Sequence, residues 1–250
     1  MPRPEAARGT PLATATGPRK GGDLLLFPSI FLEHGAIVFP KEGGEAGGEE
    51  YQALMGVSGA PVDLFDAVDH LLALYHRIYV VDVEGVREER PQFEYLQELT
   101  KGQEEWVDAG ARDSDQVMDV LVAGASRAVL STPTLRSARE IATSLKLTSQ
   151  VALEIVHDHG RVAAHDRGLD NAPVEELASE ARAAGVSHII LSSDERTVDW
   201  SLVRRVAEGG PTFVGGRFFT ESRSELASAG ARGGIFSAKE LLERWTTSGS

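Results

Sequence analysis

An alternation that runs from Asp23 to the end of the chain is the feature that most restricts the fold. Short runs of apolar and β-branched residues, typical of buried strands, alternate with longer stretches in which apolar residues recur at helical spacing. Strands are predicted at Leu24–Ile30, Arg77–Val83, Glu105–Asp108, Arg127–Ser131, Gln150–Ile155, His188–Ser192, Pro211–Val214 and Gly233–Phe236. This βαβ order is typical of a parallel sheet covered by helices.

A helix is expected after each predicted strand. The helices are predicted around Val62–His76 with Asp63 helping to start it, from near Pro91, at Ser114–Ala123, after Thr134, at Ala172–Ala184, at Trp200–Glu208, near Ser222–Ala229 and through Trp245. The Gly-rich segment Lys41–Gly59 is expected to be a loop, and Val156–Asp170 a loop or a small hairpin. Eight strand–helix pairs predict a closed (β/α)₈ TIM barrel of the α/β class, because an open doubly wound sheet usually has fewer strands.

The first part of the chain has a different composition. Residues 1–22 are rich in Pro, Gly, Ala, Thr and Arg and lack the apolar stretch of a secretory signal, so we expect a disordered tail. Residues 23–250 are expected to form a single barrel domain. No apolar run approaches the ~18 residues of a membrane helix, and the chain contains no cysteine. A soluble protein of the cytoplasm is therefore expected.

The charge of the chain is strongly negative and unevenly distributed. Twenty-five Lys and Arg against 38 Asp and Glu give −13, and the first 21 residues carry +3, which leaves −16 on the remainder. A body this acidic repels nucleic-acid phosphates and anionic lipid headgroups. We therefore expect no nucleic-acid or membrane partner, and any phosphate ligand must be held locally by backbone N–H groups.

An internal repeat emerges when the chain is shifted by 106 residues without gaps. The shift superposes Ala109-Gly110 on Gly215-Gly216, Ala123-Gly124-Ala125 on Ala229-Gly230-Ala231, and Ser131 on Ser237. Each copy reads as a strand, a glycine turn, a helix, a second strand and then a serine before the next helix. The repeat indicates two half-barrels.

The repeated glycine and serine positions suit phosphate binding, because glycine allows close backbone approach and helix N-termini complement phosphate charge. The phosphate-binding residues predicted on this basis are Gly110, Ser131, Thr132, Gly215, Gly216, Ser237 and Ala238. Arg112 and Arg217 follow the glycine turns and could either add donors to a phosphate or form surface salt bridges. The alternative is that the glycines only permit tight turns between strand and helix.

Several segments, in order and at barrel spacing, carry a resemblance to a known family. They are FPSIFLEHGAIV at Phe27–Val38, YVVDVEGVRE at Tyr79–Glu88, DAGARDSDQV at Asp108–Val117, VLSTPTL at Val129–Leu135 and VGGR at Val214–Arg217. Over about residues 23–246 the chain resembles the histidine-biosynthesis barrels HisA and HisF, which are phosphoribosylformimino-aminoimidazole carboxamide ribotide isomerase and the related cyclase subunit. DAGAR followed by STPTL is more similar to an isomerase-related side branch than to the isomerase itself.

The resemblance implies a barrel in which two phosphate grips flank two catalytic carboxylates at the ends of the first and fifth strands. The chain departs from that pattern at Phe31, where the family has an aspartate, and phenylalanine cannot transfer a proton. On the fifth strand, Glu154 supplies the second carboxylate if the following loop is two residues longer than in the family; without that gap the position is Val156.

Replacement carboxylates are sought at other strand ends, because opening an aminosugar ring needs both a proton donor and a proton acceptor. Glu154 ranks first, Asp108 at the end of the third predicted strand ranks second, and Asp82 at the end of the second is the other candidate. For Asp82 and Asp108 the competing interpretation is a residue that only caps a loop.

A local histidine cluster is formed by His157, Asp158, His159 and His165. It has no recognised ligand spacing and a loop-like context, so we interpret its members as solvated or hydrogen-bonding residues. We therefore expect no metal and no cofactor.

The leading hypothesis is a barrel that binds a phosphorylated sugar or phosphoribosyl small molecule, with altered or lost aminosugar isomerase activity. One alternative is the authentic isomerase of histidine biosynthesis, using substitute carboxylates for the residue lost at Phe31. Another is a non-catalytic protein that keeps the phosphate site for regulation or assembly. Replacing Glu154 by Gln separates an enzyme from a binding module.

Overall fold

Eight parallel strands close into a ring in the computed structural model, which describes residues 23–41, 50–99, 102–193, 197–216 and 222–248. The barrel strands, in their order around the ring, are β1 (Leu25–Glu33), β4 (Arg77–Asp82), β5 (Glu104–Asp108), β6 (Arg127–Ser131), β7 (Val151–Asp158), β9 (Ile189–Ser193), β10 (Thr212–Gly215) and β11 (Gly233–Ser237). Pairing between β1 and β11, with Phe27 opposite Ile235, closes the ring. The predicted TIM-type α/β barrel is confirmed.

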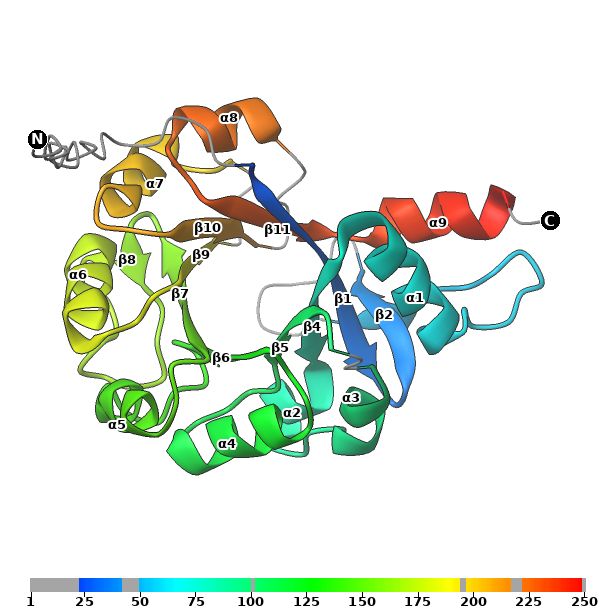
Figure 1. The fold of residues 1–250 in the computed structure, drawn as a ribbon, viewed down its shortest axis with the longest axis horizontal. Coiled ribbons are helices and arrows are strands. Elements are labelled where there is room, and N and C mark those ends of the chain that lie inside the picture. The colour runs from blue at the N-terminus through cyan, green and yellow to red at the C-terminus, as the bar shows by residue number, and fades with distance from the viewer. Residues whose placement is uncertain (1–22, 42–49, 100–101, 194–196, 217–221, 249–250) are drawn as a thin grey trace, which may run out of the picture.

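Helices surround the ring on its outside (Figure 1). They are α1 (Leu64–Tyr75), α2 (Val83–Glu88), α3 (Phe93–Leu99), α4 (Ser114–Val122), α5 (Arg139–Leu147), α6 (Val174–Ala184), α7 (Trp200–Ala207), α8 (Arg223–Ser228) and α9 (Lys239–Ser248). Asp63 caps α1 as expected, because its side chain accepts from the backbone N–H groups of Phe65 and Asp66. Among the helices of the described ranges, none is long and apolar enough to cross a bilayer.

Three short strands extend the barrel at its rim. β2 (Ala36–Pro40) folds back on β1, and β3 (Tyr51–Ala53) pairs with β2, so part of the segment predicted as the loop Lys41–Gly59 is a strand. β8 (Arg161–Val162) pairs with the end of β7 and forms the small hairpin expected within Val156–Asp170. Residues 1–22, predicted as a disordered tail, and residues 42–49 lie outside the described residues.

Helix α2 was not expected from the sequence. Gly85 lies inside it and disfavours a helix by propensity. A Cβ at this position would lie 2.4 Å from the carbonyl oxygen of Ala109, so glycine is needed for the helix to approach the turn after β5. Tertiary packing therefore outweighs helix propensity here.

Aromatic side chains fill the interior of the barrel. The ring centroid of Trp106 lies 4.5 Å from that of Phe27 and 4.8 Å from that of Phe213, and all three side chains are fully buried. These residues come from β5, β1 and β10 and point into the barrel. Because side chains alternate along a strand, the residues two positions further on also point inward. The interior is closed at this level, so any open cavity of the barrel lies beyond it, toward the strand C-termini.

The glycines of the two repeat copies share left-handed backbone conformations. Gly110 has a φ of 68° and Gly216 a φ of 127°, while the matched pair Gly124 and Gly230 have φ values of 105° and 73°. Gly124 and Gly230 follow α4 and α8, and a left-handed glycine after a helix is a common way to end it, so this part of the similarity fits any series of βα units. The duplication of a half-barrel stays a prediction.

Candidate active site

A cavity of about 360 Å³ opens at the C-terminal ends of the barrel strands. It is lined by Ser29, Phe31, Pro40, Tyr79, Val81, Val86, Asp108, Ser131, Pro133, Thr134, Glu154, Val156, Ser192, Ser193, Gly216 and Ile235. The lining combines two carboxyl groups and several hydroxyls, most of them on β5, β6, β7 and β9, with apolar side chains. Active sites of TIM barrels are built at this end, so we take this cavity as the candidate active site and call it the mouth.

The Glu154 carboxylate on β7 is held from both sides by serines of neighbouring strands. Ser131 Oγ on β6 donates to Oε2 over 2.6 Å, and Ser192 Oγ on β9 donates to Oε1 over 2.7 Å. Because each carboxylate oxygen has a hydroxyl donor, the side chain is fixed in one orientation toward the mouth. The structure therefore places the first-ranked catalytic candidate in the mouth with both oxygens anchored.

The Asp108 carboxyl lies at the end of β5, where the side chain is 5% exposed. Burial, followed by the negative charge of Glu154, raises the pKa of Asp108 to about 7, although the N–H of Gly110 and the charge of Arg112 act in the opposite direction. The Gly110 N–H donates to Asp108 Oδ1 over 2.9 Å. At neutral pH a substantial fraction of Asp108 therefore carries a proton that it can donate.

Asp82, the third carboxylate candidate, does not reach the mouth. It is fully buried, and its carboxylate accepts from the backbone N–H of Gly85 and from the backbone and side-chain nitrogens of Gln92. Tyr79 and Val81 on the same strand face the mouth, so alternation turns Asp82 to the opposite side. Its observed contacts are those of a residue that caps α2 and fixes the following loop.

Phe31 and Val156 both line the mouth. The Phe31 ring packs against Phe39, with centroids 6.3 Å apart, and against Tyr51, with centroids 5.6 Å apart. An aromatic cluster thus occupies the part of the wall where the resembled family carries its first aspartate. No proton can be transferred at this position, and Asp108 and Glu154 are the carboxyl groups that line the cavity among the described residues.

In the first repeat copy, the predicted phosphate-binding residues make bonds within the protein. The N–H of Gly110 is bonded to Asp108, and the N–H of Thr132 donates to the carbonyl oxygen of Glu154. The backbone N–H groups of Thr134 and Leu135 both donate to the carbonyl oxygen of Ser131. Thr132 Oγ1 donates to the carbonyl of Ala163. These donors are therefore already bonded to acceptors within the protein.

In the second repeat copy, the predicted residues are placed differently. Gly216 lines the mouth, and a Cβ added to it would lie 2.4 Å from the carbonyl oxygen of Ser193, so only glycine fits there. Gly215 ends β10 and Ser237 ends β11, one residue before Ala238, whose N–H donates to the carbonyl of Ser29. The ten-residue helix α9 begins directly after Ala238, which directs its N-terminus toward this end of the barrel.

Of the two arginines that follow the glycine turns, only Arg112 lies within the described residues. The Arg112 guanidinium donates to the carbonyl oxygens of Gly85, Val86 and Gly110 and pairs with Glu89 at 3.1 Å. Its donors hold α2 against the turn after β5, so Arg112 has a structural role. Arg217 lies outside the described residues.

Three members of the histidine cluster, His157, Asp158 and His159, lie on the β7–β8 hairpin, whereas His165 follows it and its backbone N–H donates to the carbonyl oxygen of Thr132. His157 is buried, whereas His159 is exposed and lies 3.7 Å from the Asp158 carboxylate. Among the described residues, no group of three or more His, Asp and Glu side chains is arranged to hold a metal ion.

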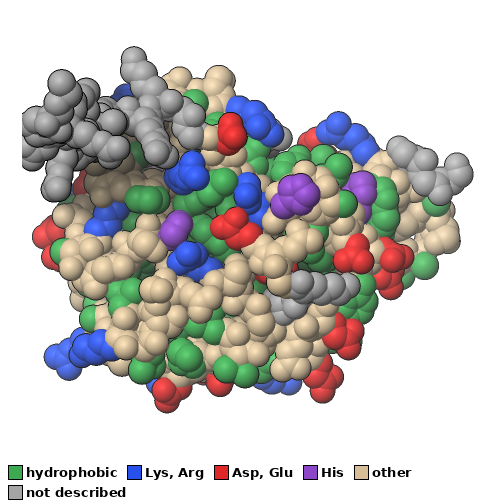
Figure 2. All heavy atoms as spheres, in the orientation of Figure 1, with side chains coloured by type: hydrophobic (Ala, Val, Ile, Leu, Met, Phe, Trp, Pro, Cys, Tyr) green, Lys and Arg blue, Asp and Glu red, His purple; other side chains and the backbone are tan. Residues whose placement is uncertain are grey.

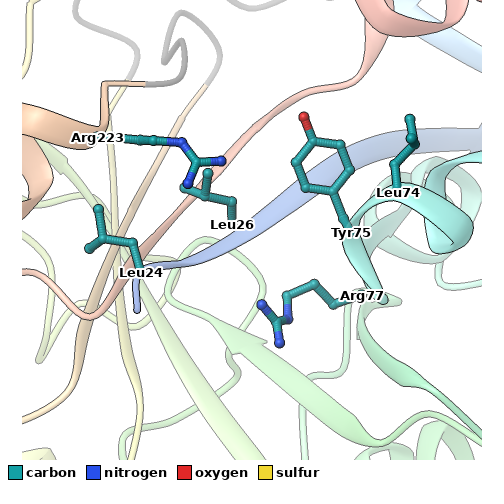
Figure 3. A pocket seen from close by; sticks show the side chains of 6 residues that line it. All are labelled: Leu24, Leu26, Leu74, Tyr75, Arg77 and Arg223. Carbon is teal, nitrogen blue, oxygen red and sulfur yellow. The ribbon is translucent and has the colours of Figure 1, made fainter. Parts of the chain in front are cut away.

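A second cavity, of about 340 Å³, lies at the opposite end of the barrel (Figure 3). It is lined by Leu24, Leu26, Leu74, Tyr75, Arg77 and Arg223. The Arg77 guanidinium pairs with Glu104 at 3.2 Å and lies over the Phe27 ring. No carboxyl group lines it among the described residues, and it lies at the N-terminal ends of β1 and β4, so its position and chemistry are less suited to proton transfer than those of the mouth.

On the face of the molecule shown in Figure 2, cationic and anionic side chains are interspersed. No large area of a single charge is seen there, despite the formal net charge of −13. This face therefore offers no extended basic surface to an anion.

Tyr79 and Ser192 are mouth residues that the sequence analysis did not single out. Ser192 is the last residue of a predicted strand, in the same position as Ser131, and this shared place was the available signal. Tyr79 lies in the middle of its strand, where an aromatic residue is usually part of the core.

Comparison with known proteins gives one family match. Residues 25–197, which span β1 to β9, match the profile of a family described as "Histidine biosynthesis protein". The matched region includes Asp108, Ser131 and Glu154 and ends before Gly216. No curated protein matches the chain.

Proposed function

The chain belongs to the histidine biosynthesis protein family, and on that premise we propose that the mouth binds a phosphorylated sugar or phosphoribosyl small molecule and transfers protons on it. The observation that carries this proposal is that Asp108 and Glu154 face one cavity in different surroundings. Two carboxyl groups whose environments differ in this way are suited to opposite roles in proton transfer.

The surroundings assign the two roles. Asp108 is the acid, because burial and the neighbouring charge raise its pKa to about 7 and keep a proton available near neutral pH. Glu154 is the base, because the Ser131 and Ser192 hydroxyls donate to its two oxygens and so match a carboxylate. A ligand between them meets a proton donor and a proton acceptor.

An aminosugar rearrangement illustrates the chemistry. The Asp108 carboxyl donates its proton to the ring oxygen as the ring carbon–oxygen bond breaks. The Glu154 carboxylate removes a proton from the neighbouring carbon, and the released electron pair forms the new double bond. Asp108 has then lost one proton and Glu154 has gained one, and exchange with solvent restores both groups.

The activity is altered from that of the family's aminosugar isomerase. Phe31 and its aromatic neighbours replace an acid on β1, which moves proton transfer to the β5–β7 side of the mouth. A ligand therefore presents its reacting atoms to Asp108 and Glu154 and its less polar part to the Phe31 side. Because the cavity is apolar on the Phe31 side, the substrate should differ in shape from that of the isomerase.

The phosphate group is assigned to the Gly216 side. The first-copy residues Gly110, Ser131 and Thr132 have their donors engaged within the protein. Gly215 and Gly216 form the edge of the mouth. Ala238 and Lys239 use their backbone N–H groups on the Ser29 carbonyl and on Ser237 Oγ, so the anion is assigned to the Gly215–Gly216 turn and to the positive end of the α9 dipole. One phosphate grip is therefore proposed in place of two.

The experiment that tests the proposal is the Glu154→Gln replacement, which keeps the size of the side chain and removes its basicity. An enzyme loses turnover of the phosphoribosylformimino substrate or of ribose 5-phosphate but still binds the ligand. A native protein that binds these ligands without any turnover is a non-catalytic binding protein, and that result contradicts the catalytic part of the proposal.

The authentic isomerase is the second candidate function. It is favoured by the position of Asp108, which lines the mouth with Glu154 and so provides the second carboxyl that Phe31 cannot supply. Complementation of a histidine auxotroph that lacks the isomerase separates the two candidates. Growth supports the authentic isomerase, and absence of growth with a folded, expressed protein supports an altered activity.

A further inference from the structure

Tyr79 has a buried hydroxyl at the base of the mouth. Its side chain projects inward from β4 and is 3% exposed, and its ring belongs to the aromatic interior that contains Phe27 and Trp106. The residue also lines the mouth, so it joins the barrel interior to the ligand cavity. Among the described residues, nothing forms a hydrogen bond with the Tyr79 hydroxyl.

Other hydroxyls of the mouth do have partners. Ser29 Oγ donates to the carbonyl of Phe236, Ser131 and Ser192 donate to Glu154, and Thr134 Oγ1 donates to the carbonyl of Ser131. A buried hydroxyl without a partner lowers stability, and phenylalanine would fill the same space without that cost. An unpartnered tyrosine at a cavity wall is therefore explained best by a partner that arrives with the ligand.

The nearby charges decide what kind of partner this is. Burial, and to a smaller extent the negative charges of Glu154 and Asp108, raise the pKa of Tyr79 well above its usual value. The phenol therefore stays protonated and can donate a hydrogen bond. A second anion between these carboxyl groups would be repelled, so the acceptor is an uncharged oxygen or nitrogen.

We propose that the Tyr79 hydroxyl donates a hydrogen bond to an uncharged acceptor of the ligand, such as a sugar hydroxyl, carbonyl or imine nitrogen. The inference rests on the proposed function, and it identifies the part of the ligand that is recognised at the base of the mouth. The phosphate is held at the Gly216 edge, so Tyr79 contacts the sugar or imine portion of the same molecule.

The test uses Tyr79→Phe, which removes only the hydroxyl, with ribose 5-phosphate as the probe. Because the hydroxyl has no protein partner, the thermal midpoint of the unliganded variant should equal or exceed that of the native protein. The affinity for ribose 5-phosphate, measured by calorimetry, should fall about 3- to 10-fold. Tyr75→Phe is the matched control, because Tyr75 lines the cavity at the opposite end, and it should leave this affinity unchanged.

Each outcome has a separate meaning. Native protein that does not bind ribose 5-phosphate contradicts the proposed function, and the inference falls with it. If the native protein and Tyr79→Phe bind ribose 5-phosphate with equal affinity, the inference is overturned but the proposed function is not. A lower thermal midpoint for unliganded Tyr79→Phe shows that the hydroxyl has a partner within the protein, which also overturns it.

Discussion

Ser131 and Glu154 lie directly opposite each other on β6 and β7, and the Ser131 hydroxyl donates to Glu154 Oε2 over 2.6 Å. Ser192 supplies the matching bond to Oε1 from β9. The carboxylate is thus oriented by the barrel itself, since both donors belong to strands that pair with β7. A base that is fixed in this way loses little freedom when a ligand binds.

The two serines should contribute to stability as well as to orientation. Ser131→Ala and Ser192→Ala should each lower the free energy of unfolding by about 1–2 kcal/mol, because each leaves one oxygen of a partly buried carboxylate without its donor. Urea titration checks this. In a Glu154→Gln background the same serine replacements should cost less, and an equal cost in both backgrounds would contradict the assigned bonds.

The raised pKa of Asp108 predicts a pH-dependent stability. Below the unfolded-state pKa near 3.8, both states are protonated; as pH rises toward the folded-state pKa of about 7, only the unfolded state loses its proton and the native protein is destabilised. Asp108→Asn should therefore be more stable than the native protein at about pH 8, by at most about 4 kcal/mol, and the difference should shrink toward about pH 4. Urea titrations at several pH values measure it, and a difference that does not change with pH is the contrary result.

Asp82 should behave as a structural residue. Asp82→Ala removes the acceptor for Gly85 and Gln92, so it should lower the free energy of unfolding by about 1–3 kcal/mol. At temperatures where the Asp82→Ala variant is still folded, its affinity for ribose 5-phosphate should equal that of the native protein. Loss of binding by a variant with a native circular dichroism spectrum would return Asp82 to the site.

Gly216→Ala should damage both the fold and the proposed phosphate grip. The left-handed φ of 127° and the approach of a Cβ to within 2.4 Å of the Ser193 carbonyl both oppose alanine. We expect a loss of stability above ~1 kcal/mol and weaker binding of ribose 5-phosphate. Gly59→Ala is the control, because Gly59 also has a positive φ but nothing lies within 4 Å of its Cβ position. If Gly216→Ala binds the probe as tightly as the control does, the phosphate is held elsewhere.

Periodicity predicted the barrel well, because strand and helix runs differ in length and spacing and bury different faces. The strand Arg127–Ser131 and the start of the helix at Ser114 match the structure residue for residue. The β2–β3 pairing was missed because it depends on contacts between segments separated by a glycine-rich stretch.

The site was harder to predict than the fold. Asp82 and Asp108 both end apolar strands, and a strand that is buried on both faces does not reveal which residues point into the barrel. Only the pairing of β4 with β5, which places Val81 opposite Asp108, shows that Asp108 faces inward and Asp82 outward. Tyr79 could not be distinguished from a core aromatic residue, because an unpartnered hydroxyl has no sequence signal.

Exchange of carbon-bound hydrogen with solvent tests the central claim most directly, because it records proton removal even when the final product is unknown. The native protein is incubated in D₂O with ribose 5-phosphate or the phosphoribosylformimino substrate, and deuterium in the recovered ligand is measured by mass spectrometry. We predict incorporation by the native protein and none by Glu154→Gln, which still binds. Binding without incorporation by the native protein, or equal incorporation by both proteins, would contradict proton transfer by Glu154.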